Sequence, residues 1–153
     1  MTNAVTDAID IAADMCAKFE GFYSKPYICP AGYWTIGYGT VFKPDGSRVT
    51  AEHLPISEAV AYAWLMHELS EVAVRGVLAA SPHLIQHPNV LAAMADFTYN
   101  LGIGRYRAST LRRRIDAKNW SGAKQELAKW IRGGGRVLPG LVRRRAAEAA
   151  LLG

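Results

Sequence analysis

Cysteine and histidine are scarce in this sequence. Its 153 residues contain two cysteines, Cys16 and Cys29, and four histidines. Two cysteines are too few for the disulfide framework of a small secreted domain. His83 and His87 stand four residues apart, but prolines bracket them in a predicted loop, and no histidine has metal-ligand spacing to a cysteine. The pattern therefore predicts no metal site.

Long apolar runs are also missing. The first twenty residues carry Asp7, Asp10 and Asp14 within their apolar pattern and lack a basic start. This segment is therefore predicted to be neither a signal peptide nor a membrane span. Half of the residues are hydrophobic and a fifth are charged, which is typical of a globular protein rather than a disordered one. At this length we expect one domain over residues 1–153.

The charge is unbalanced toward the positive side. Eighteen lysines and arginines against thirteen acidic residues give a net charge of +5. Such a surface attracts nucleic acid, anionic lipid or anionic cell-wall polymer. Much of the excess lies in two runs, Arg112–Arg114 and Arg143–Arg145. Successive helical residues point about 100° apart, so the three members of a run cannot all face one surface.

Two structural patterns divide the chain. Apolar residues from Val5 to Phe19 have helical spacing, with Thr6 as the candidate N-cap and Gly21 as the stop. The next thirty residues alternate turn formers with short β-branched and aromatic pieces. They predict an antiparallel sheet of two or three strands over roughly residues 28–49. From Ser57 onward the pattern is helical, so the predicted fold class is α+β.

The helical part is divided by glycine and proline. A nearly apolar segment from Asn89 to Leu101 is predicted to be the buried central helix. The other expected helices run from Ser57 to about Leu78, from a cap at Ser109 or Thr110, from Ser121 through Ile131, and from Pro139 to Leu152.

Glu20 is the candidate acid. It stands at the predicted end of the first helix, where the partial negative charge of the helix terminus opposes ionisation of a carboxyl group. Packing against Phe19 and Phe22 would act in the same direction. A carboxyl group that keeps its proton near neutral pH can protonate a glycosidic oxygen.

The segment around Glu20 matches a known family. With Glu20, Gly32–Tyr33 and Thr35–Gly39 in this register, the chain resembles the phage-type lysozymes, a family of glycoside hydrolases that includes the T-even phage lysozyme. The resemblance covers about Ile11 to Leu151, and the C-terminal run is most similar to endolysins of phages that infect Gram-negative bacteria. The further matching segments are Tyr99–Gly102, Ser109–Leu111, Lys129–Trp130 and Val137–Glu148.

The resemblance implies an activity and a site. It implies hydrolysis of the β-1,4 bond between N-acetylmuramic acid and N-acetylglucosamine in peptidoglycan, with host lysis at phage release. A cleft would separate a sheet-bearing lobe (about residues 20–56) from a helical lobe (about residues 57–153 plus the first helix). Glu20 would be the general acid and Thr35 would hold the attacking water. The positions implied to line the cleft are Val41, Tyr99, Asn100, Thr110 and Glu126.

The sequence departs from the family at Cys29, which occupies the position of the usual catalytic aspartate. A cysteine with the ordinary pKa of about 8.5 is mostly neutral at pH 7 and a poor base. Three readings stay open. Cys29 is deprotonated by its surroundings and replaces the aspartate as base, or it attacks the anomeric carbon as a thiolate with retention of configuration, or it is a packed thiol in a weakened homologue.

A second departure is Thr40, where the T-even enzyme has a histidine, so the ion pair of that histidine is expected to be absent. In the family an arginine of the last helix reaches toward the catalytic glutamate, and the sequence does not decide which of Arg143, Arg144 and Arg145 does so here. The remaining arginines are candidates for contact with anionic wall polymer, lipopolysaccharide or a membrane surface.

The leading hypothesis is a monomeric muramidase that needs no metal or organic cofactor. It would stay in the host cytoplasm until another protein permeabilises the inner membrane, and would then act in the periplasm. Peptidoglycan glycan strands are the expected partner, with no specific nucleic acid. Two alternatives are a lytic transglycosylase, which yields an anhydro sugar, and a catalytically silent cationic module that binds the wall or nucleic acid.

Overall fold

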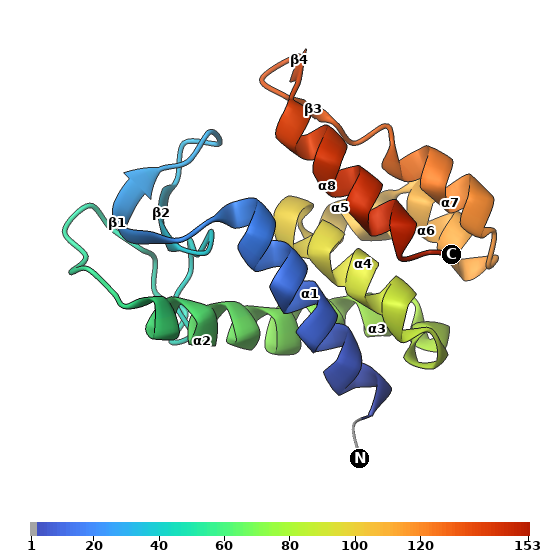
Figure 1. Cartoon of the computed structure of the whole chain (residues 1–153), viewed down its shortest axis with the longest axis horizontal. Helices are drawn as coiled ribbons and strands as arrows, with labels where there is room; N and C mark the ends of the chain where they lie inside the picture. Colours follow the sequence, from blue (N-terminus) through green and yellow to red (C-terminus); the bar gives the residue numbers. More distant parts are fainter. Residues whose placement is uncertain (1–2) are drawn as a thin grey trace.

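The computed structural model describes residues 3–153 and shows a small sheet beside a larger group of helices (Figure 1). This arrangement confirms the predicted α+β class. The elements, in chain order, are α1 (Ala4–Glu20), β1 (Tyr23–Ile28), β2 (Trp34–Gly37), α2 (Glu58–Glu68), a π-helical segment (Leu69–Val74), α3 (Arg75–Ala80), a 3₁₀ segment (Pro82–Gln86), α4 (Pro88–Leu101), α5 (Ile103–Ala108), α6 (Thr110–Asp116), α7 (Trp120–Leu127), β3 (Arg132–Gly133), β4 (Arg136–Val137) and α8 (Pro139–Ala150).

The first helix is confirmed, but its cap is not the predicted one. The Asn3 side chain caps α1 by accepting a hydrogen bond from the Thr6 backbone N–H at 2.8 Å, so the prediction of Thr6 as N-cap is wrong. Asparagine precedes the helix in extended backbone, which is the geometry of a cap, whereas Thr6 already lies in the first turn. Gly21 ends the helix with φ of +73°, a conformation that glycine adopts without strain. Helix α1 packs its buried face on α4.

The sheet begins earlier than predicted. Strands β1 and β2 pair antiparallel, with Tyr27 opposite Thr35, so the first strand starts at Tyr23 rather than near Ile28. The connection is a tight hairpin: the Gly32 N–H donates to the Cys29 carbonyl at 2.8 Å, and the Cys29 N–H donates to the Tyr33 carbonyl at 3.0 Å. Gly32 has φ of +89°, as the last residue of a three-residue hairpin loop requires. The segment up to Val49 adds only isolated bridges.

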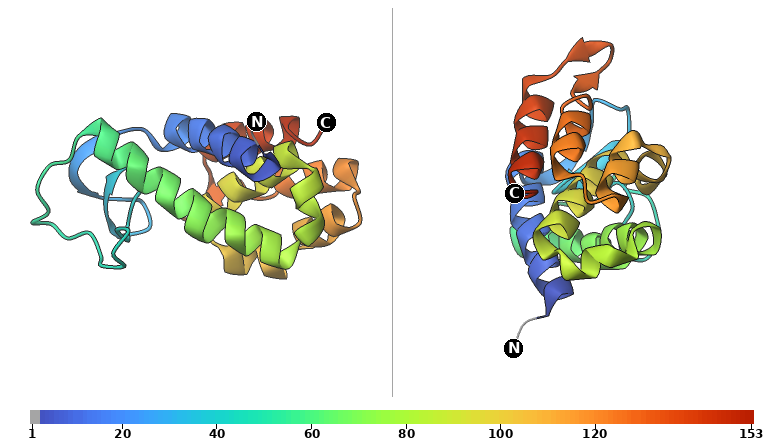
Figure 2. Two further views of the ribbon diagram at one scale, coloured as in Figure 1. Left: turned by 90° about the horizontal axis from the view of Figure 1, so that it is seen from below. Right: turned by 90° about the vertical axis from the view of Figure 1, so that its right-hand side faces the viewer.

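One long helical run joins the sheet to the rest of the molecule. Ser57 caps α2, as predicted, and the run continues through the π-helical segment and α3 to Ala80 (Figure 2). The view from below shows the hairpin and its loops at one end of this run and the other helices along it. Residues 21–57 are called the sheet lobe below, and the helices α2–α8 together with α1 the helical lobe.

Helix α4 is the centre of the helical lobe, as its apolar sequence predicts. Its residues from Val90 to Thr98 are all buried, including the one acidic residue, Asp96, which is fully inaccessible to solvent. The next helices correct two details. Ser109, one of the two predicted candidates, caps α6, whereas Asn119 rather than the predicted Ser121 caps α7. Helix α7 ends at Leu127 rather than Ile131, because the chain next forms the hairpin of β3 and β4.

Within the described residues no helix has both the length and the apolar character needed to cross a bilayer. The same residues contain no cluster of three or more side chains able to hold a metal ion.

Candidate active site

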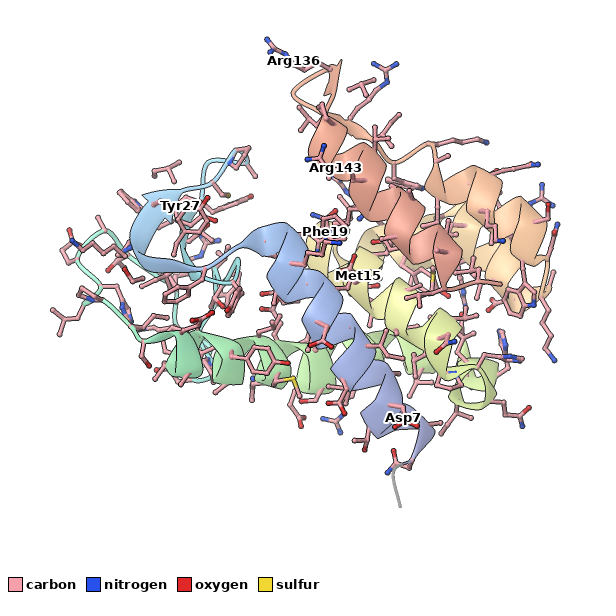
Figure 3. The ribbon with its side chains drawn as sticks, in the orientation of Figure 1. Asp7, Met15, Phe19, Tyr27, Arg136 and Arg143 are labelled. Carbon is pink, nitrogen blue, oxygen red and sulfur yellow. The ribbon has the colours of Figure 1, made fainter. Side chains whose placement is uncertain are left out.

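A pocket of about 460 Å³ lies where the end of α1 meets the start of α8. Glu20 and Phe19 come from α1, Asn100 from α4, and Pro30 from the hairpin turn. The pocket therefore borders both lobes. Figure 3 shows Phe19 and Arg143 facing this region, with Tyr27 on the hairpin beyond it. The lining residues are Lys18, Phe19, Glu20, Pro30, Asn100, Leu138, Gly140, Leu141, Arg143 and Arg144.

Glu20 is held by an arginine of α8. Its Oε1 accepts a hydrogen bond from Arg144 Nη1 at 2.7 Å, and the side chain is about one-fifth exposed. On its other side, Gly39 approaches so closely that a Cβ there would lie 2.8 Å from Glu20 Oε2. Gly39 also has φ of +79°, so both space and backbone conformation favour glycine at this position. The carboxyl group is thus fixed between the two lobes.

Asp96 fixes Arg144 in turn. The guanidinium donates from Nε to Asp96 Oδ2 and from Nη2 to Asp96 Oδ1, both at 2.9 Å. This bidentate contact leaves Nη1 of Arg144 free to reach Glu20. Asp96 therefore sets the orientation of the Arg144 guanidinium group. Burial alone would lower the pKa of Arg144, but the bonds to Asp96 outweigh it and raise the pKa above the ordinary value. Arg144 is therefore a permanent cation beside Glu20.

A second buried carboxyl group, that of Glu148, lies deeper in the same network. Burial, and then the contact with Asp96, raise the pKa of Glu148 well above its ordinary value. Burial would also raise the pKa of Asp96, but its contacts with Glu148 and Arg144 lower the pKa overall. Of the two carboxyl groups, Glu148 therefore has the higher pKa, and its Oε1 accepts from Arg145 Nη2 at 2.8 Å. Arg144 thus contacts Glu20 and Asp96, while Arg145 contacts Glu148.

Arg145 orients Asn100, the one predicted substrate contact that lines the pocket. Its Nη2 donates to Asn100 Oδ1 at 2.8 Å, and its guanidinium lies 5.1 Å from the centre of the Phe97 ring. This contact fixes the orientation of the Asn100 amide group at the pocket wall.

Cys29 and Thr35 lie together on the hairpin. Cys29 opens the turn that contains Pro30, and Thr35 is on β2, where it is 2% exposed. The Thr35 hydroxyl has two acceptors within reach, the Tyr33 carbonyl at 2.9 Å and the Cys29 sulfur, and it can donate to one at a time. Partial burial would raise the pKa of Cys29. The hydrogen bonds from Thr35 and from backbone groups of the turn outweigh burial and lower the pKa below the ordinary value.

Tyr27 links this pair to Glu20 electrostatically. Its pKa is raised to about 12, first by burial and then by the charge of Glu20, with smaller effects of Tyr23 and Cys29. Tyr27 thus stays protonated near Glu20 and Cys29. Its ring packs on the ring of Tyr23, with 4.3 Å between the ring centres.

The other predicted substrate contacts do not line this pocket. Tyr99 donates its hydroxyl to the Tyr38 carbonyl and so joins α4 to the sheet lobe. Thr110 accepts from Arg113 at 2.9 Å, and Glu126 accepts from Lys129 at 2.9 Å. Val41 is partly buried, with its carbonyl bonded to the Val49 N–H.

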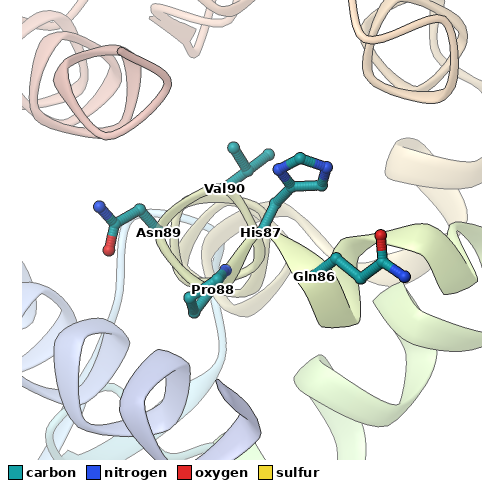
Figure 4. Close-up of a pocket in the computed structure, with 5 residues that line it drawn as sticks. All are labelled: Gln86, His87, Pro88, Asn89 and Val90. Carbon is teal, nitrogen blue, oxygen red and sulfur yellow. The ribbon is translucent and has the colours of Figure 1, made fainter.

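A second pocket, of about 230 Å³, lies at the start of α4 and contains none of the predicted site residues (Figure 4). It is formed by one continuous segment, Gln86–Val90, without a contribution from the sheet lobe.

Comparison with known proteins identifies the family of the chain. The family model described as phage lysozyme matches residues 17–148. The chain belongs to the phage lysozyme family. The endolysin of Acyrthosiphon pisum secondary endosymbiont phage 1 is 32% identical over 139 residues, which cover 88% of this chain and 89% of that protein.

Two solved structures show the same fold. The endolysin from Escherichia coli O157:H7 phage FAHEc1 has a TM-score of 0.79 and 29% identity, covering 93% of this chain and 90% of that one. The muramidase domain of SpmX from Asticaccaulis excentricus has a TM-score of 0.72 and 28% identity, covering 92% and 93%. This phage lysozyme is therefore a lysozyme-type glycosidase that takes part in lysis of the cell wall.

Sequence reasoning missed much of the support of Glu20 in this lysozyme. Asp96, Glu148 and Cys16 were not identified, although Cys16 donates its thiol to Asp96 Oδ1 at 3.0 Å. Asp96 could have been identified from the sequence, because a single carboxylate in an otherwise apolar helix needs a buried partner.

Glu68, at the end of α2, is a further titratable group near the site. Burial, and then the charge of Glu20, raise its pKa from the ordinary 4.5 to about 7. The pKa of Glu68 is higher in the folded than in the unfolded protein. Its neutral form therefore stabilises the folded state below pH 4.5. This contribution to the free energy of unfolding is lost as the pH rises through 7.

We expect Glu68→Gln to make the lysozyme more stable than wild type by about 1–2 kcal/mol at pH 8, allowing for partial exposure, and to change little at pH 4.5. Urea denaturation at both pH values measures the difference. Glu71→Gln is the control, since Glu71 is about half exposed and pairs with exposed Arg75. An equal pH dependence in Glu68→Gln and wild type would contradict the assignment.

Proposed function

We propose that this phage lysozyme is an endolysin muramidase that hydrolyses the β-1,4 bond between N-acetylmuramic acid and N-acetylglucosamine. The observation that carries the proposal is the position of Glu20: a carboxyl group fixed by Arg144 and Gly39, at the wall of a pocket that also includes the hairpin turn. Family membership supplies peptidoglycan as the substrate.

Glu20 is proposed as the general acid. In its protonated form it donates a proton to the glycosidic oxygen as the bond to the anomeric carbon breaks. The Arg144 guanidinium then stabilises the carboxylate that remains, through the contact at 2.7 Å. Water adds to the anomeric carbon, so that hydrolysis gives one new reducing end for each bond broken.

Cys29 is proposed as the base for this water. The thiolate is the form that accepts a proton, and the hydrogen bonds of the hairpin turn favour it by lowering the pKa. Thr35 keeps lone pairs for a water molecule when its proton is donated to Tyr33 or to the sulfur. In this mechanism the proton of the attacking water passes to the sulfur of Cys29, and the product has inverted configuration.

The test of the function is product analysis on purified Gram-negative sacculi. We expect a fall in turbidity, and mass spectrometry of the soluble fragments should show N-acetylmuramic acid at the reducing end. Anhydro products would assign the protein to the lytic transglycosylases instead. Intact sacculi after long incubation would favour a silent binding module.

The role of Cys29 has its own test. We expect Cys29→Ser to lose about 10²-fold or more of the hydrolysis rate, because a serine hydroxyl is not ionised near neutral pH, whereas Cys29→Asp should keep much of it. Full activity in Cys29→Ser would remove the thiol from the mechanism. NMR of the first-formed anomer separates base from nucleophile, since direct attack by water inverts the configuration and a covalent intermediate on Cys29 retains it.

A further inference from the structure

An arginine on the sheet lobe is stacked on two aromatic rings. The guanidinium carbon of Arg48 lies 5.7 Å from the centre of the Tyr33 ring and 5.0 Å from the centre of the Phe42 ring. Both distances are within the range of cation–π contacts. Among residues 3–153 no carboxylate forms an ion pair with Arg48. We name Tyr33, Phe42 and Arg48 the arginine clamp.

The loop after β2 is folded so that Arg48 lies opposite Phe42. The two residues form an antiparallel bridge, and the turn between them is closed by a hydrogen bond from the Lys43 N–H to the Ser47 carbonyl at 2.8 Å. Val49, the residue after Arg48, is 4% exposed and its N–H donates to the Val41 carbonyl at 2.9 Å. The loop is therefore anchored on its buried side and presents Arg48 on its exposed side.

Tyr33 connects the clamp to the two hairpin residues of the candidate site. Its carbonyl oxygen is within hydrogen-bond distance of the Cys29 N–H at 3.0 Å and of the Thr35 hydroxyl at 2.9 Å. The Tyr33 ring extends to the surface, where it contacts Arg48. A shift of the Tyr33 backbone therefore changes the hydrogen bonds of both Cys29 and Thr35.

The tip of the hairpin is exposed. Strands β1 and β2 form a two-stranded sheet, and two strands alone are marginally stable in water. Residues 31–34, which follow Cys29 in the turn, are all exposed, whereas Thr35 is buried. The contacts of Arg48 join this exposed turn to the anchored loop, so they restrict its movement.

We propose that Arg48 is a positioning residue for the reaction: by stacking on Tyr33 and Phe42, it keeps the hairpin turn in the conformation in which Cys29 and Thr35 hold the attacking water. The effect on the reaction rate rests on the proposed function. Arg48 acts through the shape of the turn rather than through its charge. The largest influences on the pKa of Cys29 are burial and then the hydrogen bonds from Thr35 and from backbone groups of the turn.

Titration of the Cys29 thiol tests the clamp without any hydrolysis. The rate of alkylation by iodoacetamide is measured against pH, and mass spectrometry of the Cys29 peptide separates it from fully buried Cys16. We expect Arg48→Ala to move the midpoint to higher pH by about half a unit or more, because a looser turn donates fewer hydrogen bonds to the thiolate. The midpoint reports ionisation and not access to the thiol.

Two further variants show whether stacking is the cause. Phe42→Leu keeps an apolar side chain but removes one ring, so it should move the midpoint in the same direction. The double variant Phe42→Leu/Arg48→Ala should move it no further than Arg48→Ala alone, since the clamp is already broken. Arg48→Lys keeps the charge without the planar guanidinium group, and its midpoint should stay above that of wild type.

The matched control is Arg114→Ala, which removes the same charge from an exposed arginine of α6. Its midpoint should equal that of wild type. Circular dichroism should show all variants folded, because Phe42 and Arg48 are exposed.

Hydrolysis of purified sacculi is the second measurement. Arg48→Ala should lower kcat by about threefold to tenfold and leave the apparent KM little changed, because no member of the clamp lines the pocket. Arg114→Ala should keep the wild-type kcat.

An unchanged thiol midpoint in Arg48→Ala would overturn the proposal, whatever happens to the rate. A wild-type midpoint in Arg48→Lys would overturn it as well, because charge alone would then be sufficient. A raised apparent KM with an unchanged midpoint would assign Arg48 to substrate binding instead. If wild type releases no reducing ends while the midpoint still depends on Arg48 and Phe42, the muramidase proposal fails and the positioning of Cys29 by the clamp stands.

Discussion

Glu20→Gln is expected to lower the rate of peptidoglycan hydrolysis by about 10³-fold or more. Glutamine has nearly the same shape and can still accept the hydrogen bond from Arg144 Nη1, but it cannot donate a proton to a leaving oxygen. The measurement is the initial rate of release of reducing ends from purified sacculi.

The variant should remain folded, because only one polar atom changes and the contact with Arg144 is kept. Binding to sacculi, measured by sedimentation, should stay close to that of wild type, which separates loss of chemistry from loss of affinity. A variant that keeps more than a tenth of the wild-type rate would remove Glu20 as the proton donor.

Arg144→Met is expected to cost about 3–5 kcal/mol of the free energy of unfolding at pH 7. Methionine fills part of the space but leaves Asp96, which is fully buried, and Glu20 without their shared cation. Urea denaturation measures the change. Arg143→Met is the matched control, since Arg143 is exposed and makes no ion pair among the described residues, and it should cost no more than about 0.5 kcal/mol.

The effect of Arg144→Met should depend on pH. In the wild type the pKa of Asp96 is lowered in the folded state, so its ionised form stabilises the fold above the ordinary value of 3.8, and this contribution is lost as the pH falls through the folded pKa. The difference between the proteins should therefore be largest near neutral pH and should shrink in acid.

A double variant sharpens the test. Asp96→Asn/Arg144→Met removes both charges, so it should be less destabilised than the sum of its single variants. Additive losses would mean that the two side chains do not act as a pair.

Several features of the fold could be predicted because they depend on short segments of the sequence. Gly21 ends α1, Ser57 starts α2 and Pro139 starts α8, and each depends on backbone preferences within a few residues. The predicted caps at Thr6 and Ser121 were wrong by a few residues because an asparagine just before each of them supplies the capping side chain, Asn3 for α1 and Asn119 for α7.

The candidate site was predictable only in part. The segment around Glu20 and the departure at Cys29 are visible in the sequence, as is the need for an arginine from the last helix. Which arginine it is depends on how α8 is rotated against α4. That rotation turns Arg144 toward Asp96 and Glu20, and leaves Arg143 at the mouth of the pocket.

The sequence by itself determined the order of helices and strands, the positions of most breaks and the family of the chain, since these follow from short-range preferences and from residues in a fixed order. The tertiary structure decided which charges meet. Glu20 and Arg144 are 124 residues apart, and Asp96 and Arg144 are 48 apart. Such partners are brought together by the packing of α1, α4 and α8 in space, which no local pattern specifies.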